Sequence, residues 1–140
     1  MFQVLVFFVT LVAVNVVSYT YASSSQLGTV KFPTSSSGPA QKHFIRGLAA
    51  LHSFWYTEAI SAFEQSTIED PDFAMGYWGL AMAHNHPLWE DQDKKSASEA
   101  LSKITGFSKL TRREQGYIHA VRLLYGDGEK HIRDKAYSKA

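Results

Sequence analysis

The chain has 140 residues, of which 45% are apolar, a formal net charge of +1 and no cysteine. This length allows one domain at most, and the near-neutral charge argues against nucleic acid as a partner. Because cysteine is absent, disulfides, thiolate zinc sites and cysteine nucleophiles are excluded.

The first 22 residues have the features of an export signal. Residues 2–17 are almost wholly apolar, and Thr20-Tyr21-Ala22 provides small residues where signal peptidases cut. We therefore expect a cleaved signal peptide, residues 1–22, and an extracellular or periplasmic protein that has no membrane contact after cleavage. No Lys or Arg precedes the apolar core, so an uncleaved membrane anchor through residues 2–22 is the alternative.

Residues 23–40 predict a linker, because they are rich in Ser, Gly, Thr and Pro, which disfavour a helix interior. Within this linker, residues 29–33 suit one short extended segment. The linker as a whole can lie along the first helix.

Residues 41–140 predict six helices in three hairpins, 41–71, 72–106 and 111–140. Apolar spacing and chain breaks place the helices over residues 41–54, 57–68, 72–85, 96–105, 111–125 and 129–140. Pro71 stops the second helix, and capping boxes at Ser96-x-x-Glu99 and Thr111-x-x-Glu114 start the fourth and fifth. An inserted loop, residues 88–95, lengthens the second hairpin.

One short phrase, Gly-Leu-Ala-x-x-His, occurs twice, beginning at Gly47 and again 32 residues later at Gly79. A period in the thirties is typical of helical-hairpin repeats, in which each unit covers the apolar face of its neighbour. The second helices share Ala-apolar-Ser, beginning at Ala59, Ala100 and Ala136. The sequence therefore predicts an all-α fold built from repeats.

These patterns resemble the tetratricopeptide repeat (TPR) family. The first-helix pattern of that family, an aromatic, a Leu and a small residue, is matched by Tyr77, Leu80 and Ala81. The second-helix pattern is matched by Ala59, Phe63 and Pro71. Longer phrases within residues 44–56, 74–79, 85–89, 113–118 and 134–137 are similar to a group of mostly bacterial TPR proteins without assigned chemistry. The resemblance covers residues 27–140.

The resemblance implies an α-solenoid that acts as a protein–protein interaction scaffold and binds a protein or peptide in a concave groove, without a cofactor. In such proteins more helices follow, so we expect this chain to be an N-terminal fragment. The longer second loop and the poorly matching third hairpin depart from the family pattern. The residues expected to contact a partner are Arg46, Trp78, Met82, His84 and Arg122, and Trp78 and Met82 are expected to be exposed.

Six aromatic residues allow two interpretations. They either fill the core between hairpins or line the groove as anchors for a peptide. These residues are Phe54, Trp55, Tyr56, Tyr77, Trp78 and Trp89.

A different function is suggested by a histidine cluster, which would make the chain a secreted metal-binding protein or metalloenzyme. His52 and His84 occupy matching places in the repeats, and His86 and Glu90 follow, so these four side chains could bind zinc. Alternatively, the histidines serve packing and helix capping. The sequence has no Gly-rich phosphate loop and no Gly-x-Ser-x-Gly elbow, so an enzyme is not otherwise expected.

The formal charges are unevenly distributed along the chain. Residues 41–93 carry a net charge of −6, and residues 94–140 carry +6. These halves either pair between copies of the chain, which gives self-association, or form two solvated surfaces.

Overall fold

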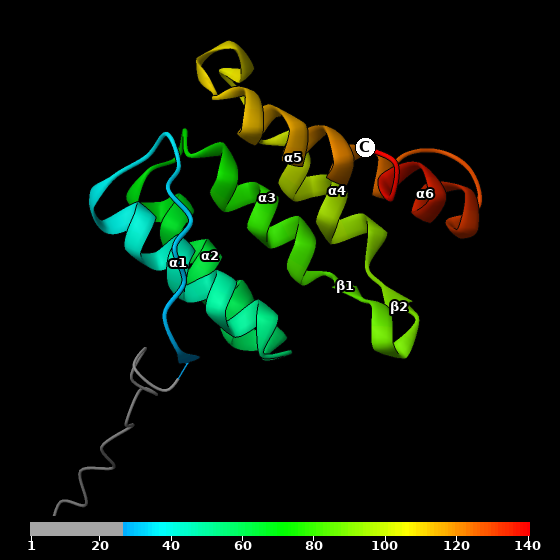
Figure 1. Ribbon diagram of the computed structural model, residues 1–140, viewed down its shortest axis with the longest axis horizontal. Coiled ribbons are helices and arrows are strands. Elements are labelled where there is room, and N and C mark those ends of the chain that lie inside the picture. The colour runs from blue at the N-terminus through cyan, green and yellow to red at the C-terminus, as the bar shows by residue number, and fades with distance from the viewer. Residues whose placement is uncertain (1–26) are drawn as a thin grey trace, which may run out of the picture.

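The structure is a computed structural model that describes residues 27–140 (Figure 1). These residues form six α-helices and one two-stranded β-hairpin, so the prediction of an all-α fold is confirmed. The predicted signal peptide, residues 1–22, and the alternative membrane anchor, residues 2–22, lie outside the described residues. Within residues 27–140, no helix has the length and apolar character needed to cross a membrane.

The helices in chain order are α1 (Gly38–His52), α2 (Tyr56–Glu69), α3 (Ala74–Ala83), α4 (Lys94–Ser102), α5 (Arg112–Leu124) and α6 (Lys130–Tyr137). Strand β1 (Asn85–His86), the 3-10 helix η2 (Pro87–Trp89) and strand β2 (Asp91–Gln92) connect α3 to α4. A second 3-10 helix, η3 (Phe107–Lys109), precedes α5. The two strands pair antiparallel, with Asn85 opposite Gln92 and His86 opposite Asp91. Part of the predicted insertion loop, residues 88–95, therefore belongs to a small hairpin.

Helix α3 is the centre of the fold. It packs against α2 and α4, its neighbours in the chain, and also against α1 and α5. Helix α1 pairs with α2, and α5 pairs with α6. Figure 1 shows the result: α1, α3 and α5 lie side by side in that order across the molecule.

The two glycines of the repeated phrase face one aromatic ring. Phe63 on α2 is fully buried. A Cβ atom added at Gly47 on α1 would lie 2.6 Å from this ring, and one added at Gly79 on α3 would lie 2.4 Å from it. Both distances are too short for any side chain. The 32-residue period therefore has a packing reason, because α1 and α3 each need a glycine to approach Phe63.

Gly79→Ala is expected to destabilise the protein, because overpacking of a core by one methyl group costs roughly 1–3 kcal/mol. Alanine is the better helix former by roughly 1 kcal/mol, so the matched control Gly116→Ala should be stabilising. Gly116 lies on α5, and apart from its chain neighbours and the nearby backbone of α5 itself, no atom comes within 4 Å of its Cβ position. Urea denaturation of both variants measures the contrast, and equal effects at the two positions would contradict the packing around Phe63.

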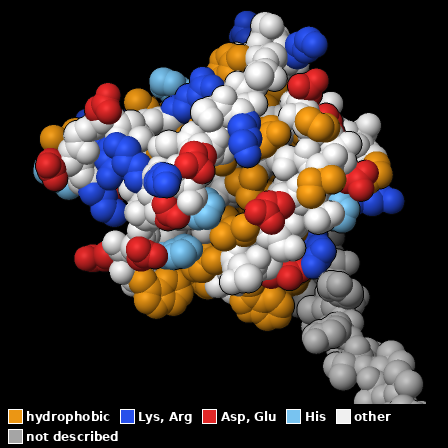
Figure 2. All heavy atoms as spheres, turned by 180° about the vertical axis from the view of Figure 1, so that it is seen from behind, with side chains coloured by type: hydrophobic (Ala, Val, Ile, Leu, Met, Phe, Trp, Pro, Cys, Tyr) orange, Lys and Arg blue, Asp and Glu red, His pale blue; other side chains and the backbone are white. Residues whose placement is uncertain are grey.

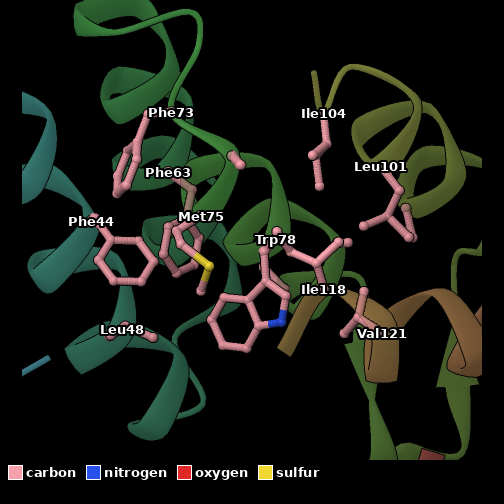
Figure 3. Packing of buried hydrophobic residues seen from close by; sticks show 14 of the residues in the cluster. Phe44, Leu48, Phe63, Phe73, Met75, Trp78, Leu101, Ile104, Ile118 and Val121 are labelled. Carbon is pink, nitrogen blue, oxygen red and sulfur yellow. The ribbon is translucent and has the colours of Figure 1, made fainter. Parts of the chain in front are cut away.

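Trp78 joins the two ends of the hydrophobic core. Figure 3 shows its indole between Phe44 and Met75 on one side and Ile118 and Val121 on the other. Trp78 is only 7% exposed, and the other four side chains are fully buried. The core is therefore continuous from α1 to α5.

Helix α1 differs from its predicted bounds of 41–54 for local reasons. It begins earlier, at Gly38, because Pro39 suits the first turn of a helix, where the missing N–H needs no partner. It ends at His52, and Phe54 then adopts a left-handed backbone with φ 60°. The turn leaves Trp55 47% exposed, so this aromatic residue does not fill the core between hairpins.

The prediction of a capping box at Ser96 is also wrong. Helix α4 begins at Lys94, and its N-cap is Asp93, whose carboxylate accepts the Ser96 N–H at 3.0 Å. Asp caps a helix as well as Ser does, and the end of β2 places Asp93 where the helix can start. The capping box between Thr111 and Glu114, in contrast, is confirmed.

Candidate functional site

Residues 27–37, here called the strap, follow an extended path and lie against α1, α3 and α5. Figure 1 shows the strap as the blue segment that crosses in front of α1. Phe32 is its apolar anchor. The centroid of the Phe32 ring lies 5.6 Å from that of Phe44 on α1, 6.5 Å from that of Trp78 on α3 and 5.4 Å from that of Tyr117 on α5. One side chain of the strap thus contacts all three helices.

Two side chains bind backbone carbonyls of the strap. The Nε2–H of Gln41 donates to the carbonyl oxygen of Phe32 at 2.8 Å, and the guanidinium of Arg113 donates to the carbonyl oxygen of Pro33. The guanidinium of Arg113 also lies over the ring of Phe32, 4.7 Å from its centroid. Such a cation–π contact contributes more as it is shielded from water.

Glu114 is fully buried and connects the strap to the start of α5. Its Oε1 accepts the N–H of Ser35 at 2.7 Å and the hydroxyl of Ser35 at 2.9 Å. Its Oε2 accepts the N–H and the hydroxyl of Thr111 at 2.9 Å and 2.8 Å. Burial raises the pKa of Glu114, but these four hydrogen bonds favour the carboxylate and together hold the pKa below its ordinary value. A buried negative charge therefore fixes Ser35 in place.

The strap site has the contacts by which proteins recognise an extended peptide. It offers donors for backbone carbonyls, an acceptor for a backbone N–H and an aromatic pocket for one side chain. Peptides of many different sequences could make the backbone contacts, whereas the aromatic pocket favours a peptide with an aromatic residue at that position. The strap site consists of Gln41, Phe44, Trp78, Arg113, Glu114 and Tyr117.

An open cavity of about 480 Å³ adjoins the strap site along α5. Trp78, Arg113 and Tyr117 belong both to the strap site and to the lining of this cavity. Gly116 and Ala120 of α5 also line it. The aromatic surface therefore continues beyond the strap and leaves room for further residues of a peptide.

The structure does not bring the five predicted partner-binding residues together on one face. Trp78 is buried rather than exposed, and its Nε1–H donates to the carbonyl oxygen of Tyr117 at 3.2 Å. The prediction that Trp78 is exposed is therefore wrong, because Phe32 of the strap stacks on it. Met82 is half-buried and packs against the core.

The three charged or titratable members of that set lie in separate places. His84 follows α3 and shares a cavity with Ile60 of α2 and Glu99 of α4, and this cavity has no residue in common with the strap site. Burial lowers the pKa of His84. Arg122 lies over the ring of η3 residue Phe107, 5.5 Å from its centroid. Arg46 forms an ion pair across to α2.

The alternative zinc site, made of His52, His84, His86 and Glu90, is not formed. Among residues 27–140, no group of three or more His, Asp or Glu side chains is placed to hold a metal ion. Both ring nitrogens of His86 are engaged, since Nδ1 lies 3.0 Å from Asp91 Oδ2 and Nε2 lies 3.1 Å from the carbonyl oxygen of Ala83. The structure of residues 27–140 therefore does not show this ligand set gathered around one point.

Sequence reasoning did not identify the strap as part of a site. The available signal was weak: Val30 and Phe32 are the apolar residues at alternate positions of a polar linker. Alternate residues of an extended segment point the same way. Both side chains are half-buried against the core. A linker with two apolar residues at this spacing is therefore a candidate for a packed strand.

Comparison of the chain with protein-family models, with curated proteins and with solved structures found no match in any of the three. The function proposed below accordingly depends on the geometry of the strap site.

Proposed function

We propose that this protein is an exported peptide-binding module of tetratricopeptide type, and that α1, α3 and α5 form the inner face of a short solenoid. Three features support the repeat architecture. Consecutive helices pack in pairs, the first helices of these pairs are neighbours, and two glycines 32 residues apart have the same packing role. The apolar run of residues 2–17 supports export.

The observation that carries the binding function is the way in which the strap is held. An aromatic pocket, two backbone donors and one buried carboxylate converge on it from helices distant in sequence; Ser35 and Glu114 are 79 residues apart. A partner that presents an extended segment with an aromatic residue followed by Pro would make the same contacts. We infer that the strap occupies, within its own chain, the place that such a partner takes.

Occupation by the strap lowers the apparent affinity for a partner. A partner binds only those molecules whose strap has left, so the apparent Kd is the intrinsic Kd divided by the open fraction. Full burial of a Phe side chain contributes about 1.5–3 kcal/mol, and Phe32 is half-buried. Loss of the Phe32 ring should therefore raise the open fraction by roughly tenfold.

Phe32→Ala is expected to increase, by about tenfold or more, the affinity of the full chain for a peptide of residues 28–38 added in solution. Fluorescence anisotropy of the fluorescein-labelled peptide measures this change. Lys31→Ala is the matched control, since Lys31 is the exposed neighbour of Phe32 in the strap, and it should behave as the unchanged chain does.

A second peptide, with Ala in place of Phe32, should bind neither protein. If the unmodified peptide fails to bind the Phe32→Ala variant while that variant keeps its helical circular dichroism, the strap is a structural segment and the proposal is wrong.

A further inference from the structure

A second surface lies where the α1–α2 turn meets the β1–β2 hairpin. Four of the eight exposed large hydrophobic residues in the described chain lie here, and we call them the aromatic patch: Phe54 (51% exposed), Trp55 (47%), Leu88 (68%) and Trp89 (62%). Figure 2 shows large hydrophobic side chains along the lower edge of the molecule, the edge at which this turn and hairpin lie in Figure 1. None of these residues belongs to the strap site.

The two loops that form the patch are fixed to one another by ring contacts. The ring centroids of Tyr56 and His86 are 4.0 Å apart, and Trp89 lies 6.0 Å from Tyr56 and 6.5 Å from Phe54. His86 is held in turn by Asp91 across the hairpin, at 3.0 Å. A surface that is already ordered loses less entropy when it binds a partner.

Backbone strain is concentrated in the same two loops. Phe54 (φ 60°) and Glu90 (φ 52°) are the two non-glycine residues with positive φ among residues 27–140. A left-handed backbone costs an L-residue roughly 1–2 kcal/mol, which glycine would avoid. Strain retained at one surface, where glycine would relieve it, points to a use for the side chains.

The patch lies in the acidic part of the chain. From residue 47 to residue 93 the sequence has eight Asp or Glu residues and no Lys or Arg. Glu90 and Asp91 are exposed beside Trp89. A cavity of about 540 Å³ opens at the patch, and its lining includes Tyr56 and His86. The surface therefore combines aromatic faces with negative charge.

We propose that the aromatic patch binds a positively charged, arginine-bearing segment of a partner protein. The rings of Phe54, Tyr56 and Trp89 stand at 66°, 74° and 81° to one another, with centroids 6.0–6.5 Å apart. Rings at such steep angles offer faces in several directions, and a guanidinium group stacks on aromatic faces. The neighbouring carboxylates supply the opposite charge. A lipid membrane is a less favourable partner, because the carboxylates of Glu90 and Asp91 would lose their hydration when Trp89 inserted into the membrane.

The test follows the three indole N–H signals of the full chain by NMR during titration with the peptide acetyl-Gly-Arg-Leu-Arg-Gly-amide. The signals of Trp55 and Trp89 should shift saturably. The signal of Trp78 should stay in place, since its N–H is bound to the carbonyl oxygen of Tyr117. The same peptide with Glu in place of Arg should move none of them. Trp55→Phe and Trp89→Phe assign the signals.

Two variants test the assigned roles. Trp89→Ala should weaken binding of the arginine peptide by about 30-fold, as expected for a central aromatic anchor. Glu90→Gln should weaken it by roughly two- to fivefold, as expected for an exposed charge. Ile132→Ala, an exposed apolar residue on α6, is the matched control and should leave the affinity unchanged.

Three results would overturn the proposal: no saturable shift of Trp55 and Trp89, equal binding of the glutamate peptide, or tighter binding to phosphatidylcholine vesicles than to the arginine peptide. Shifts that depend on the concentration of the protein alone would instead assign the patch to a second copy of the chain, and would also overturn it. The strap-site assay uses none of these residues, so the two proposals stand or fall separately.

Discussion

Phe63→Ala is expected to lower the free energy of unfolding by about 3–5 kcal/mol. Phe63 is fully buried on α2 and fills the space that Gly47 and Gly79 leave open, so its removal leaves a cavity shared by three helices. Phe44, whose ring centroid lies 5.8 Å from that of Phe63, also loses a packing partner. A domain of this size has a total stability of only about 5–15 kcal/mol, so the variant should be close to unfolding.

Urea denaturation followed by far-ultraviolet circular dichroism measures this loss. Ile68→Ala on the same helix is the control, because Ile68 is 67% exposed and should change the stability by less than about 0.5 kcal/mol. A loss below about 1.5 kcal/mol for Phe63→Ala would show that the ring is not the contact around which the three helices pack.

The double variant of Phe63→Ala and Gly79→Ala extends the test to the repeat itself. In the presence of Phe63, the methyl group that Gly79→Ala introduces overlaps the ring, but without the ring it enters an empty space. The substitution at Gly79 should therefore become stabilising in the Phe63→Ala background. A coupling energy of roughly 0.5–3 kcal/mol between the two substitutions is typical of residues in direct contact. If the stability changes of the two single variants simply add in the double variant, the proposed packing reason for the 32-residue period is wrong.

Glu114→Gln is expected to lower the free energy of unfolding by about 2–4 kcal/mol at neutral pH, since hydrogen bonds to a charged group contribute about 1.5–3 kcal/mol each. The carboxylate accepts all four hydrogen bonds from Ser35 and Thr111. In either orientation, the amide of glutamine would turn its NH2 group toward one of the two backbone N–H groups. The variant should therefore loosen both the strap and the start of α5.

The effect of Glu114→Gln should depend on pH. The pKa of Glu114 is below 4.5 in the folded chain and takes the ordinary value of 4.5 in the unfolded chain. Between these two values the unfolded chain binds more protons, so stability rises with pH. The contribution of Glu114 is fully present above the unfolded pKa and is lost as the pH falls through the folded pKa.

Urea denaturation from neutral pH downward, on the unchanged chain and on Glu114→Gln, measures this dependence. The stability difference between the two proteins should shrink once the pH falls below 4.5. Glu99→Gln, an exposed position on α4, is the matched control and should track the unchanged chain. A difference that stays constant across the acid range would mean that the charge of Glu114 does not hold the strap.

The contacts of the strap connect the expected effect of Glu114→Gln with the proposed peptide binding. Phe32 contacts α1, α3 and α5, and Ser35 reaches the buried Glu114. A partner peptide must replace both contacts. Phe32→Ala removes the first from the strap and leaves the site intact, so it should raise the affinity for the peptide. Glu114→Gln weakens the hold on the strap and on the peptide alike, so it should leave the apparent affinity nearly unchanged.

The sequence by itself determined the helical architecture, because the signals for it are local. The capping box at Thr111 and Glu114 lies within one turn, and Pro71 stops α2 through its own backbone geometry. The repeated phrase that begins at Gly47 and Gly79 also indicated helical hairpins through its 32-residue period. These features can be recognised from residues that are neighbours in the sequence or from a regular spacing along it.

Only the tertiary structure decided the site, because its contacts join residues that no local pattern relates. In the sequence pattern Trp78 flanks the apolar face of its helix, which predicts an exposed side chain. In the structure Phe32 of the strap stacks on Trp78 and covers it. Ser35 and Glu114 meet across 79 residues. The predicted zinc ligands are not gathered among residues 27–140, and both ring nitrogens of His86 have other partners. The spacing of apolar residues in the sequence indicates which face of a helix is buried. Only the folded structure shows which residues from other parts of the chain cover that face.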